Sequence, residues 1–190
     1  MPGLRIISGK VKGYHLKDVP GDSTRPITDM VKEALFNILA DDVDGCSFWD
    51  LFGGTGSVGL EALSRGAKFA QFSDNNRAAI LTLKQNIAST GFEKQAHLIS
   101  ADAFMLLRQS PSQIFDYIYI APPQYKGLWK TALLVLDEHP AHLVPDGWAI
   151  VQIHPKEYEA VNLVNFTLLE ERKYGNTLLL FYEKKAEQTG

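Results

Sequence analysis

The chain has 190 residues, 45% of them hydrophobic and 22% charged, which is the size and composition of a folded domain with its own core. It contains no apolar run of the roughly eighteen residues that a bilayer span needs, and it begins without the apolar region of a secretory signal, so we expect a cytoplasmic protein. One cysteine and five scattered histidines favour neither a disulfide nor a metal site, and the net charge of −3 argues at first against a nucleic-acid partner.

The first 17 residues carry only basic charge, from Arg5, Lys10, Lys12 and Lys17. Their net charge is +4, whereas the other 173 residues together carry −7. One interpretation is a solvated N-terminal hairpin, since short charge clusters are common on protein surfaces. The other is an arm that contacts phosphate, which would make nucleic-acid binding local and salt-sensitive.

A helix is predicted to follow Thr28 and to end at Leu39. Thr28 is a good N-cap, Asp29 falls in the first turn, and apolar residues recur along one face. No linker rich in Gly, Pro or Ser divides the rest of the chain. We expect residues 1–40 to form a basic hairpin and helix, followed by one compact domain over residues 41–190.

From Cys46 onward, short apolar runs alternate with amphipathic stretches, which is typical of a parallel sheet covered by helices on both faces. Five strands are expected at residues 48–52, 69–74, 96–101, 117–121 and 148–154. Helices are expected at residues 57–65 and 76–90, after Asp102, and at about residues 128–139.

Two further strands, residues 166–171 and 177–183, are joined by a connection too short for a parallel crossover. The last strand must therefore run antiparallel to its neighbour. Five parallel strands and a closing hairpin predict an α/β, Rossmann-like fold, the seven-stranded sheet of class I S-adenosylmethionine (SAM) methyltransferases.

A glycine-rich turn, residues 50–59 (DLFGGTGSVG), follows the first strand of this sheet. Glycines at 54, 56 and 59 match G-x-G-x-x-G, which allows a tight turn and close approach of a ligand to a helix N-terminus. The pattern alone is compatible with nicotinamide dinucleotides, flavins and SAM. No substrate domain or catalytic histidine or lysine accompanies it, so a nicotinamide dehydrogenase is disfavoured.

Acidic side chains follow three successive strands: Asp50, Asp74 and Asp102. Asp50 favours SAM, because a carboxylate there would repel a pyrophosphate but can engage a cationic ammonium group. Asp74 suits ribose hydroxyls, and Asp102 could accept from the adenine amine. The alternative is that each acid caps the following helix. The expected SAM-binding residues are Asp50, Phe52, Gly53, Gly54, Gly56, Asp74, Asn75, Asp102 and Ala103.

After the apolar strand ending at Ile120 comes a rigid segment, residues 121–125 (APPQY). Two prolines leave the carbonyls without competing amide donors, so the backbone can point oxygens at a ligand.

Several segments of the chain resemble the RsmD group of 16S rRNA guanine-N2 methyltransferases. They are residues 5–10 (RIISGK), residues 25–37 (RPITDMVKEALFN), and residues 50–56 (DLFGGTG) with residues 59–66 (GLEALSRG). Together with Pro122-Pro123 and Gly127-Leu128, the resemblance runs from about residue 4 to residue 183.

The resemblance implies transfer of a methyl group from SAM to the exocyclic N2 of a guanine in 16S rRNA, free or in the small ribosomal subunit. It places the basic arm and residues 25–37 beside the active-site mouth. The expected RNA-binding residues are therefore Arg5, Lys10, Lys12, Lys17 and Arg25; Arg25 could instead pair with Asp29. Deletion of the arm is expected to remove RNA affinity and to spare SAM affinity. We expect a monomer with neither a membrane nor a metal partner.

The family's usual reaction motif is Asp-Pro-Pro followed by Phe or Tyr, which orients the target amine and stacks on the extruded base. Here Ala121 replaces the Asp and Gln124 replaces the aromatic residue. The backbone carbonyls of Ala121 and Pro122 remain available to the amine. Tyr125 could supply the ring and Gln124 an amide oxygen, or both could merely border a loop. The expected catalytic segment is Ala121, Pro122, Pro123, Gln124 and Tyr125.

Two other functions stay open from the residues alone. One is a module that binds SAM or RNA without turnover, because of Ala121 and Gln124. The other is an amino methyltransferase of adenine N6 or of DNA, since Pro-Pro loops serve exocyclic amines on several bases.

Overall fold

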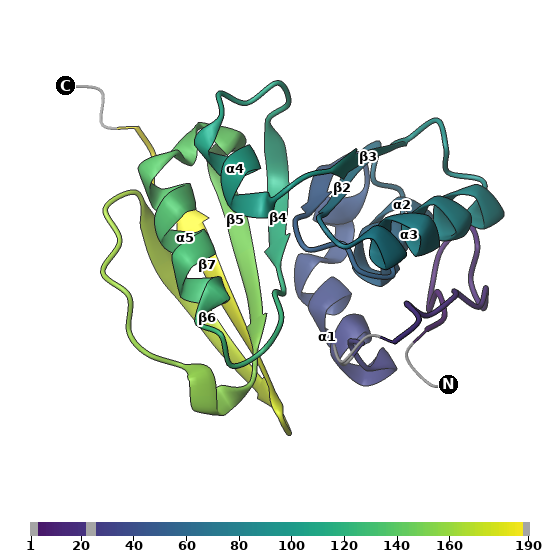
Figure 1. Cartoon of the computed structure of the whole chain (residues 1–190). Helices are drawn as coiled ribbons and strands as arrows, with labels where there is room; N and C mark the ends of the chain where they lie inside the picture. The colour runs from purple at the N-terminus through teal and green to yellow at the C-terminus, as the bar shows by residue number, and fades with distance from the viewer. Residues whose placement is uncertain (1–3, 22–25, 188–190) are drawn as a thin grey trace. The chain divides into compact units, whose positions relative to one another are not determined.

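The structure is a computed structural model that describes residues 4–21 and 26–187 (Figure 1). The chain divides into two compact units, Met1–Asp102 and Ala103–Gly190, here called the first and second units. The boundary expected near residue 40 stays a prediction.

The N-terminal arm consists of two short segments of the chain that run antiparallel to each other. One isolated bridge joins Arg5 to His15, and the backbone N–H of Ile6 donates to the carbonyl of Tyr14 at 2.9 Å. The arm therefore keeps a hairpin path through a few backbone hydrogen bonds.

Helix α1, Asp29–Leu39, begins where the sequence predicts, because the side chain of Thr28 accepts from the N–H of Val31 at 3.3 Å. Its apolar residues Val31, Leu35, Phe36 and Leu39 are buried, whereas Met30 is 62% exposed. A 3₁₀ turn, Ala40–Val43, leads from the helix into the sheet of the first unit.

The first unit contains a parallel sheet in the order β3-β2-β1. Its strands are β1 (Ser47–Asp50), β2 (Phe69–Asp74) and β3 (Ala96–Ser100). Helices α2 (Ser57–Ser64) and α3 (Arg77–Thr90) follow β1 and β2. Strands and helices thus alternate along this part of the chain, as the spacing of its apolar residues predicts.

Local signals set both ends of α3. The side-chain oxygen of Asn76 accepts from the N–H of Ala78 at 2.8 Å, and Gly91 ends the helix in a left-handed conformation with φ +78°. These caps explain why the sequence alone places this helix within one residue.

The second unit contains strands in the order β4-β5-β7-β6. They are β4 (Phe115–Ile120), β5 (Leu143–Ile153), β6 (Phe166–Tyr174) and β7 (Thr177–Lys184). β4 and β5 are parallel, and β7 pairs antiparallel with both β5 and β6. The antiparallel last strand is therefore confirmed.

β5 begins at Leu143, whereas the sequence predicts a start at Trp148. Pro145-Asp146-Gly147 reads as a turn, but the structure accommodates it as an irregularity inside the strand, with Asp146 at φ +62°. Leu143 pairs with Phe115 and Trp148 with Tyr117 across that irregularity.

Helices α4 (Ala103–Arg108) and α5 (Leu128–Glu138) lie side by side over the sheet of the second unit (Figure 1). Two 3₁₀ turns, Pro140–His142 and Pro155–Glu157, flank β5. Within residues 4–21 and 26–187, no helix combines the length and the apolar sequence needed to cross a membrane.

Candidate active site and RNA-binding arm

The glycine-rich turn connects β1 to α2 as a tight loop. The N–H of Gly53 donates to the carbonyl of Ser73 at 2.8 Å, and the N–H of Gly56 donates to the carbonyl of Gly53 at 2.8 Å. Gly54 and Gly56 adopt φ values of +56° and +81°, in the left-handed region that favours glycine. The turn therefore delivers the chain sharply to the N-terminus of α2, where backbone N–H groups can face a ligand.

Gly59, the third glycine of the pattern, serves packing. A Cβ on this residue would lie 2.4 Å from Cε1 of Phe72, a buried side chain of β2. Only glycine lets α2 approach the sheet this closely, as the G-x-G-x-x-G pattern requires.

Asp50 ends β1 and is 2% exposed. Its Oδ2 accepts from the N–H of Gly59 at 3.1 Å, so it ties the strand to the first turn of α2. Burial raises the pKa of this carboxyl well above its ordinary value, and the nearby Asp74 carboxylate raises it further. The hydrogen bond from Gly59 opposes that rise. A cationic ligand group beside Asp50 would also oppose the rise in pKa, because it would stabilise the charged carboxylate.

Asp74 ends β2 and contacts the glycine-rich turn directly. Its Oδ2 accepts from the N–H of Gly54 at 3.0 Å, and its Oδ1 accepts from the N–H of Asn76 at 2.9 Å. A carboxylate has about four acceptor positions, so each oxygen can accept one bond more, for example from a ribose hydroxyl. The donor and acceptor set at this edge therefore fits SAM.

The remaining residues expected to bind SAM follow the same three strands, β1, β2 and β3. Phe52 and Gly53 belong to the turn, and Asn75 is exposed after β2. Asp102 follows β3 and ends the first unit; Ala103 begins α4 in the second. Because β1, β2 and β3 are parallel, their carboxyl ends share one edge, where open α/β sheets bind ligands.

The Pro-Pro segment leaves β4 of the second unit. Pro122 is buried, whereas Gln124 is exposed and Tyr125 is 64% exposed. Tyr125 has φ +62°, an unusual conformation for a residue with a side chain. Its N–H donates to Oε1 of Glu157 at 2.7 Å, which holds the loop in that conformation.

Glu157 and His154 are residues of this region that our reading of the sequence missed. Oε2 of Glu157 accepts from the N–H of His154 at 3.0 Å, and Nδ1 of His154 accepts from the N–H of Lys156 at 3.1 Å. The imidazole lies 5.6 Å from the ring of Tyr125, between ring centres, at 40°. Residues 154–157 form a capping box, whose Pro-x-Glu spacing was the available signal.

The N-terminal arm docks on the C-terminal half of α2. The N–H of Lys10 donates to the carbonyl of Ser64 at 2.8 Å, and the hydroxyl of Ser64 donates to the carbonyl of Ser8 at 2.6 Å. A Cβ on Gly9 would lie 1.9 Å from the Ser64 carbonyl oxygen, so this approach requires glycine.

A buried carboxylate receives the backbone of the same arm. Glu61 is 0% exposed and accepts from the N–H of Ile7 at 2.9 Å and of Ser8 at 3.1 Å. Arg65 donates to it at 2.8 Å, and Nζ of Lys32 lies 3.5 Å away. Burial lowers the pKa of Lys32, and the Glu61 carboxylate opposes that effect. The arm is therefore anchored to a desolvated ion-pair network.

The basic side chains of the arm differ in their surroundings. Lys10, Lys12 and Lys17 are exposed. Arg5 is 55% exposed, and its Nε donates to Oδ2 of Asp29 at 2.7 Å. Arg25, the fifth expected RNA contact, lies outside the described residues.

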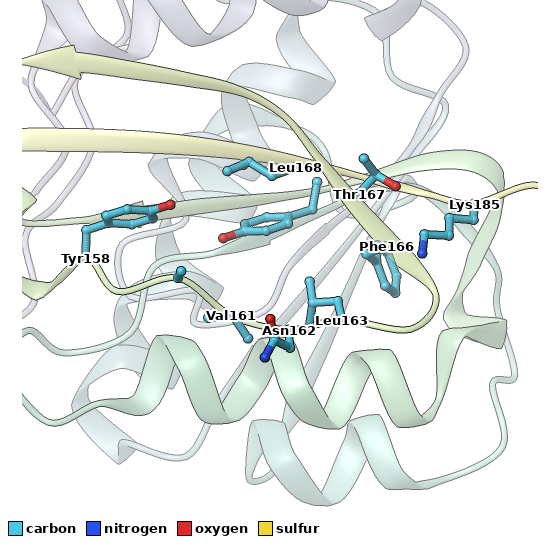
Figure 2. A pocket seen from close by; sticks show the side chains of 10 residues that line it. Tyr158, Val161, Asn162, Leu163, Phe166, Thr167, Leu168 and Lys185 are labelled. Carbon is cyan, nitrogen blue, oxygen red and sulfur yellow. The ribbon is translucent and has the colours of Figure 1, made fainter.

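The second unit also holds a pocket of about 390 Å³ between the segment after Glu157 and strands β6 and β7. Figure 2 shows Tyr158 toward one end, Phe166 within the lining and Lys185 toward the other end. Among the described residues, its lining includes none that the sequence assigns to SAM, the base or phosphate.

The fold and the glycine-rich turn together define a class of protein, the class I SAM-dependent methyltransferases, with seven strands of which the last is antiparallel. The solved structure described as "Putative methyltransferase yhhF from Escherichia coli" is similar to this chain, with a TM-score of 0.83 and 31% identity. The similarity covers 96% of this chain and 98% of that one. The fold predicted from the sequence is therefore confirmed.

This chain belongs to the family described as "Conserved hypothetical protein 95", whose model matches residues 4–183, and it is RsmD-like as predicted. It is 36% identical to "Putative rRNA methyltransferase YlbH" of Bacillus subtilis, over 96% of this chain and all of that protein. It is 32% identical to "Ribosomal RNA small subunit methyltransferase D" of Haemophilus influenzae, over 95% of this chain and 93% of that protein.

A more distant likeness concerns the fold alone. An RNA methyltransferase from Salinibacter ruber, solved in complex with S-adenosylhomocysteine, has the same fold with a TM-score of 0.66 and 11% identity. The fold of the class and the relatives named as methyltransferases support the predicted cofactor, SAM.

Proposed function

We propose that this protein transfers a methyl group from SAM to the exocyclic N2 of a guanine in 16S rRNA of the small ribosomal subunit. The match of 95% of the chain to the Haemophilus protein named for small-subunit rRNA methylation carries the proposal. The resemblance of the sequence to guanine-N2 enzymes supports the choice of base and atom.

SAM supplies, when bound, an electrophilic methyl group on a sulfonium. The first unit offers acceptors for its polar groups: Asp50 for the ammonium, Asp74 for the ribose hydroxyls and Asp102 for the adenine amine. The glycine-rich turn contributes close backbone approach, and Asp74 keeps the turn in place through Gly54.

The Pro-Pro segment orients the amine of the target base. The carbonyls of Ala121 and Pro122 accept its two N–H bonds, and Pro123 brings no N–H that would compete for them. A guanine amine attacks as a neutral nucleophile, so the main requirement is alignment of its lone pair with the methyl group. Ala121 lacks the carboxylate of the family motif, so this orientation rests on the backbone.

The exposed ring of Tyr125 provides a stacking surface for the extruded base. Glu157 positions it through the backbone, and the imidazole of His154 borders it. Because Nδ1 of His154 accepts a hydrogen bond, the proton of the neutral ring is assigned to Nε2, which can donate to a guanine acceptor. Tyr125→Ala is expected to lower kcat/KM about tenfold and Tyr125→Phe about twofold or less, from the stacking energy of one base.

The deciding experiment incubates the purified protein and labelled SAM with undermethylated small subunits and, separately, with their free 16S rRNA. Nucleoside mass spectrometry should then detect N2-methylguanosine. A family member with an intact Asp-Pro-Pro motif, run in parallel, shows that the substrate is competent. Labelled N6-methyladenosine or labelled DNA would support the amino methyltransferase alternative, and SAM binding without turnover on any substrate would support the non-catalytic module.

We propose further that exposed Lys10, Lys12 and Lys17, with Arg5 and Arg25, contact RNA phosphate. A substrate in the small ribosomal subunit implies action in the cytoplasm. The protein is proposed to act as a monomer, for which light scattering after size exclusion is the test.

A further inference from the structure

One buried side chain joins the basic arm to the glycine-rich turn. Asn86 of α3 is 0% exposed, and its Oδ1 accepts from the N–H of Lys17 at 2.8 Å. Its Nδ2 donates to the carbonyl of Lys17 at 3.0 Å and to the carbonyl of Thr55 at 2.8 Å. Thr55 lies between Gly54 and Gly56, so a single amide holds the end of the arm and the middle of the turn together.

The hydrogen-bond pattern leaves no freedom in how this amide is oriented. Only Oδ1 can accept from the N–H of Lys17, and only Nδ2 can donate to two carbonyls. Both N–H bonds of the amide are used. A buried amide saturated in this way transmits displacement of one partner to the other, because leaving any of these groups unpaired in the interior is costly.

A second connection reaches the other end of the turn. Nζ of Lys32 donates to the carbonyl of Arg5 at 2.6 Å and to the hydroxyl of Ser57 at 2.9 Å. Ser57 is the first residue of α2 and follows Gly56 directly. Both ends of the arm are therefore tied to the loop that receives the cofactor.

We infer that Asn86 is a positioning residue that couples the basic arm to the cofactor loop, so that RNA on the arm and SAM in the loop each raise the affinity for the other. RNA that binds the docked arm stabilises the conformation in which Asn86 holds the carbonyl of Thr55. SAM needs the turn in that conformation. Two ligands that favour the same conformation show positive coupling, and linkage makes the effect equal in both directions.

The coupling to RNA rests on the proposed function, whereas the claim that Asn86 positions the glycine-rich turn does not. The expectation that deletion of the arm spares SAM affinity is replaced accordingly. Such a deletion would remove the backbone partners of Glu61 and Asn86, both fully buried, and would therefore disturb the loop as well.

The test measures the affinity for S-adenosylhomocysteine, which cannot turn over, by equilibrium dialysis with and without unmodified 16S rRNA. Asn86→Asp keeps the oxygen for the N–H of Lys17 and replaces both donors by an acceptor. Thr90→Val is the matched control, since this buried hydroxyl of the same helix donates to the carbonyls of Asn86 and Ile87 in that helix. Asn86→Ala, without a buried charge, substitutes if the Asp variant fails to fold.

In the wild type and in Thr90→Val, RNA is expected to tighten S-adenosylhomocysteine binding at least about fivefold. In Asn86→Asp, affinity without RNA should fall about fivefold, the value of one buried hydrogen bond, and RNA should improve it less than about twofold. A residue that only stabilised the fold would leave the ratio with and without RNA unchanged.

Two outcomes overturn the inference: RNA binds the wild type without changing its S-adenosylhomocysteine affinity, or folded Asn86 variants keep both that affinity and the ratio. Failure of any form to bind RNA would instead count against the proposed function. The loss of affinity in the Asn86 variants, measured without RNA, would still decide whether Asn86 positions the loop.

Discussion

At the scale of single residues, Ala121 bears most directly on how the proposed methyl transfer would proceed. A methyl group stands where the family motif has a carboxylate, yet methyl transfer from a sulfonium depends mainly on alignment. The backbone of residues 121–123 is constrained by two prolines and follows the buried strand β4, so the carbonyls keep a defined direction. A residual activity carried by backbone acceptors is therefore expected.

Restoring the carboxylate should raise the rate. A charge-assisted hydrogen bond contributes roughly 1.5 to 3 kcal/mol, so Ala121→Asp is expected to increase kcat about ten- to a hundredfold if the bond forms only in the transition state. Single-turnover transfer of labelled methyl to undermethylated small subunits measures the change. Ala121→Asn, which offers a neutral acceptor, should fall between the two, and an equal rate in all three would contradict a role for this position.

Asp50 makes stability depend on pH in a predictable direction. Because its pKa is raised in the folded protein, the folded state holds this proton more tightly than the unfolded chain does. Stability without ligand is therefore lost as pH rises above the unfolded value of about 4 and through the folded pKa. Asp50→Asn keeps an oxygen for the N–H of Gly59 and carries no charge at any pH.

Asp50→Asn is accordingly expected to raise the melting temperature of the ligand-free protein at pH 8, by about 2–4 °C for each 1 kcal/mol, with a smaller gain at pH 5. Asp42→Asn, at an exposed position, should change the free energy of unfolding by no more than the ~0.5 kcal/mol typical of surface substitutions, at both pH values. Calorimetry should also show weaker SAM binding in Asp50→Asn. A gain in melting temperature over wild type that is smaller at pH 8 than at pH 5 would contradict the assignment.

At the scale of elements, the contact between α2 and β2 fixes where the glycine-rich turn ends. Gly59 lies against the ring of Phe72, and the N–H of the same glycine binds Asp50. A shift of α2 away from the sheet would therefore move the carboxylate as well as the helix N-terminus. Packing and the predicted ligand site share these residues.

Gly59→Ala is expected to destabilise the protein by about 1–3 kcal/mol, the usual cost of overpacking, despite the better helix propensity of alanine. Urea unfolding followed by circular dichroism measures the midpoint. In a Phe72→Leu background the same substitution should cost clearly less, because the smaller side chain makes room for the new methyl group. Equal costs in the two backgrounds would show that the clash with Phe72 is relieved in another way.

At the scale of the whole molecule, charge is divided between a basic arm and an acidic remainder. Lys10, Lys12 and Lys17 are exposed, so they can be changed without breaking the buried network around Glu61. The acidic remainder would keep non-specific RNA binding weak, while the arm attracts phosphate locally.

Replacing these three lysines by glutamine is expected to weaken RNA binding and to reduce the slope of log K against log salt by about 2, at roughly 0.7 for each phosphate contact to single-stranded RNA. Filter binding at several salt concentrations gives the slope. Lys68, Lys84 and Lys94, exposed elsewhere in the first unit, form a control triple with the same change of charge. Equal slopes in the two triple variants would argue against an RNA-binding arm.

Much of the fold was accessible from local patterns. Thr28 and Asn76 cap helices with their own side chains, and Gly91 ends a helix through its backbone, so these boundaries depend on a few neighbouring residues. The extended start of β5 was not accessible, because pairing of Leu143 with Phe115 overrides the turn propensity of Pro145-Asp146-Gly147.

By itself, the sequence determined the class of fold, the glycine-rich turn, the acids that end the strands and the uneven distribution of charge. Those features depend on the spacing of apolar residues, on glycines at fixed positions and on the order of charged residues along the chain. Only the tertiary structure decided that Glu157 holds Tyr125, that β7 lies between β5 and β6, and that Asn86 joins Lys17 to Thr55. The physical reason is that side chains far apart in the chain choose their partners by burial and saturation of hydrogen bonds, for which the local sequence carries no pattern.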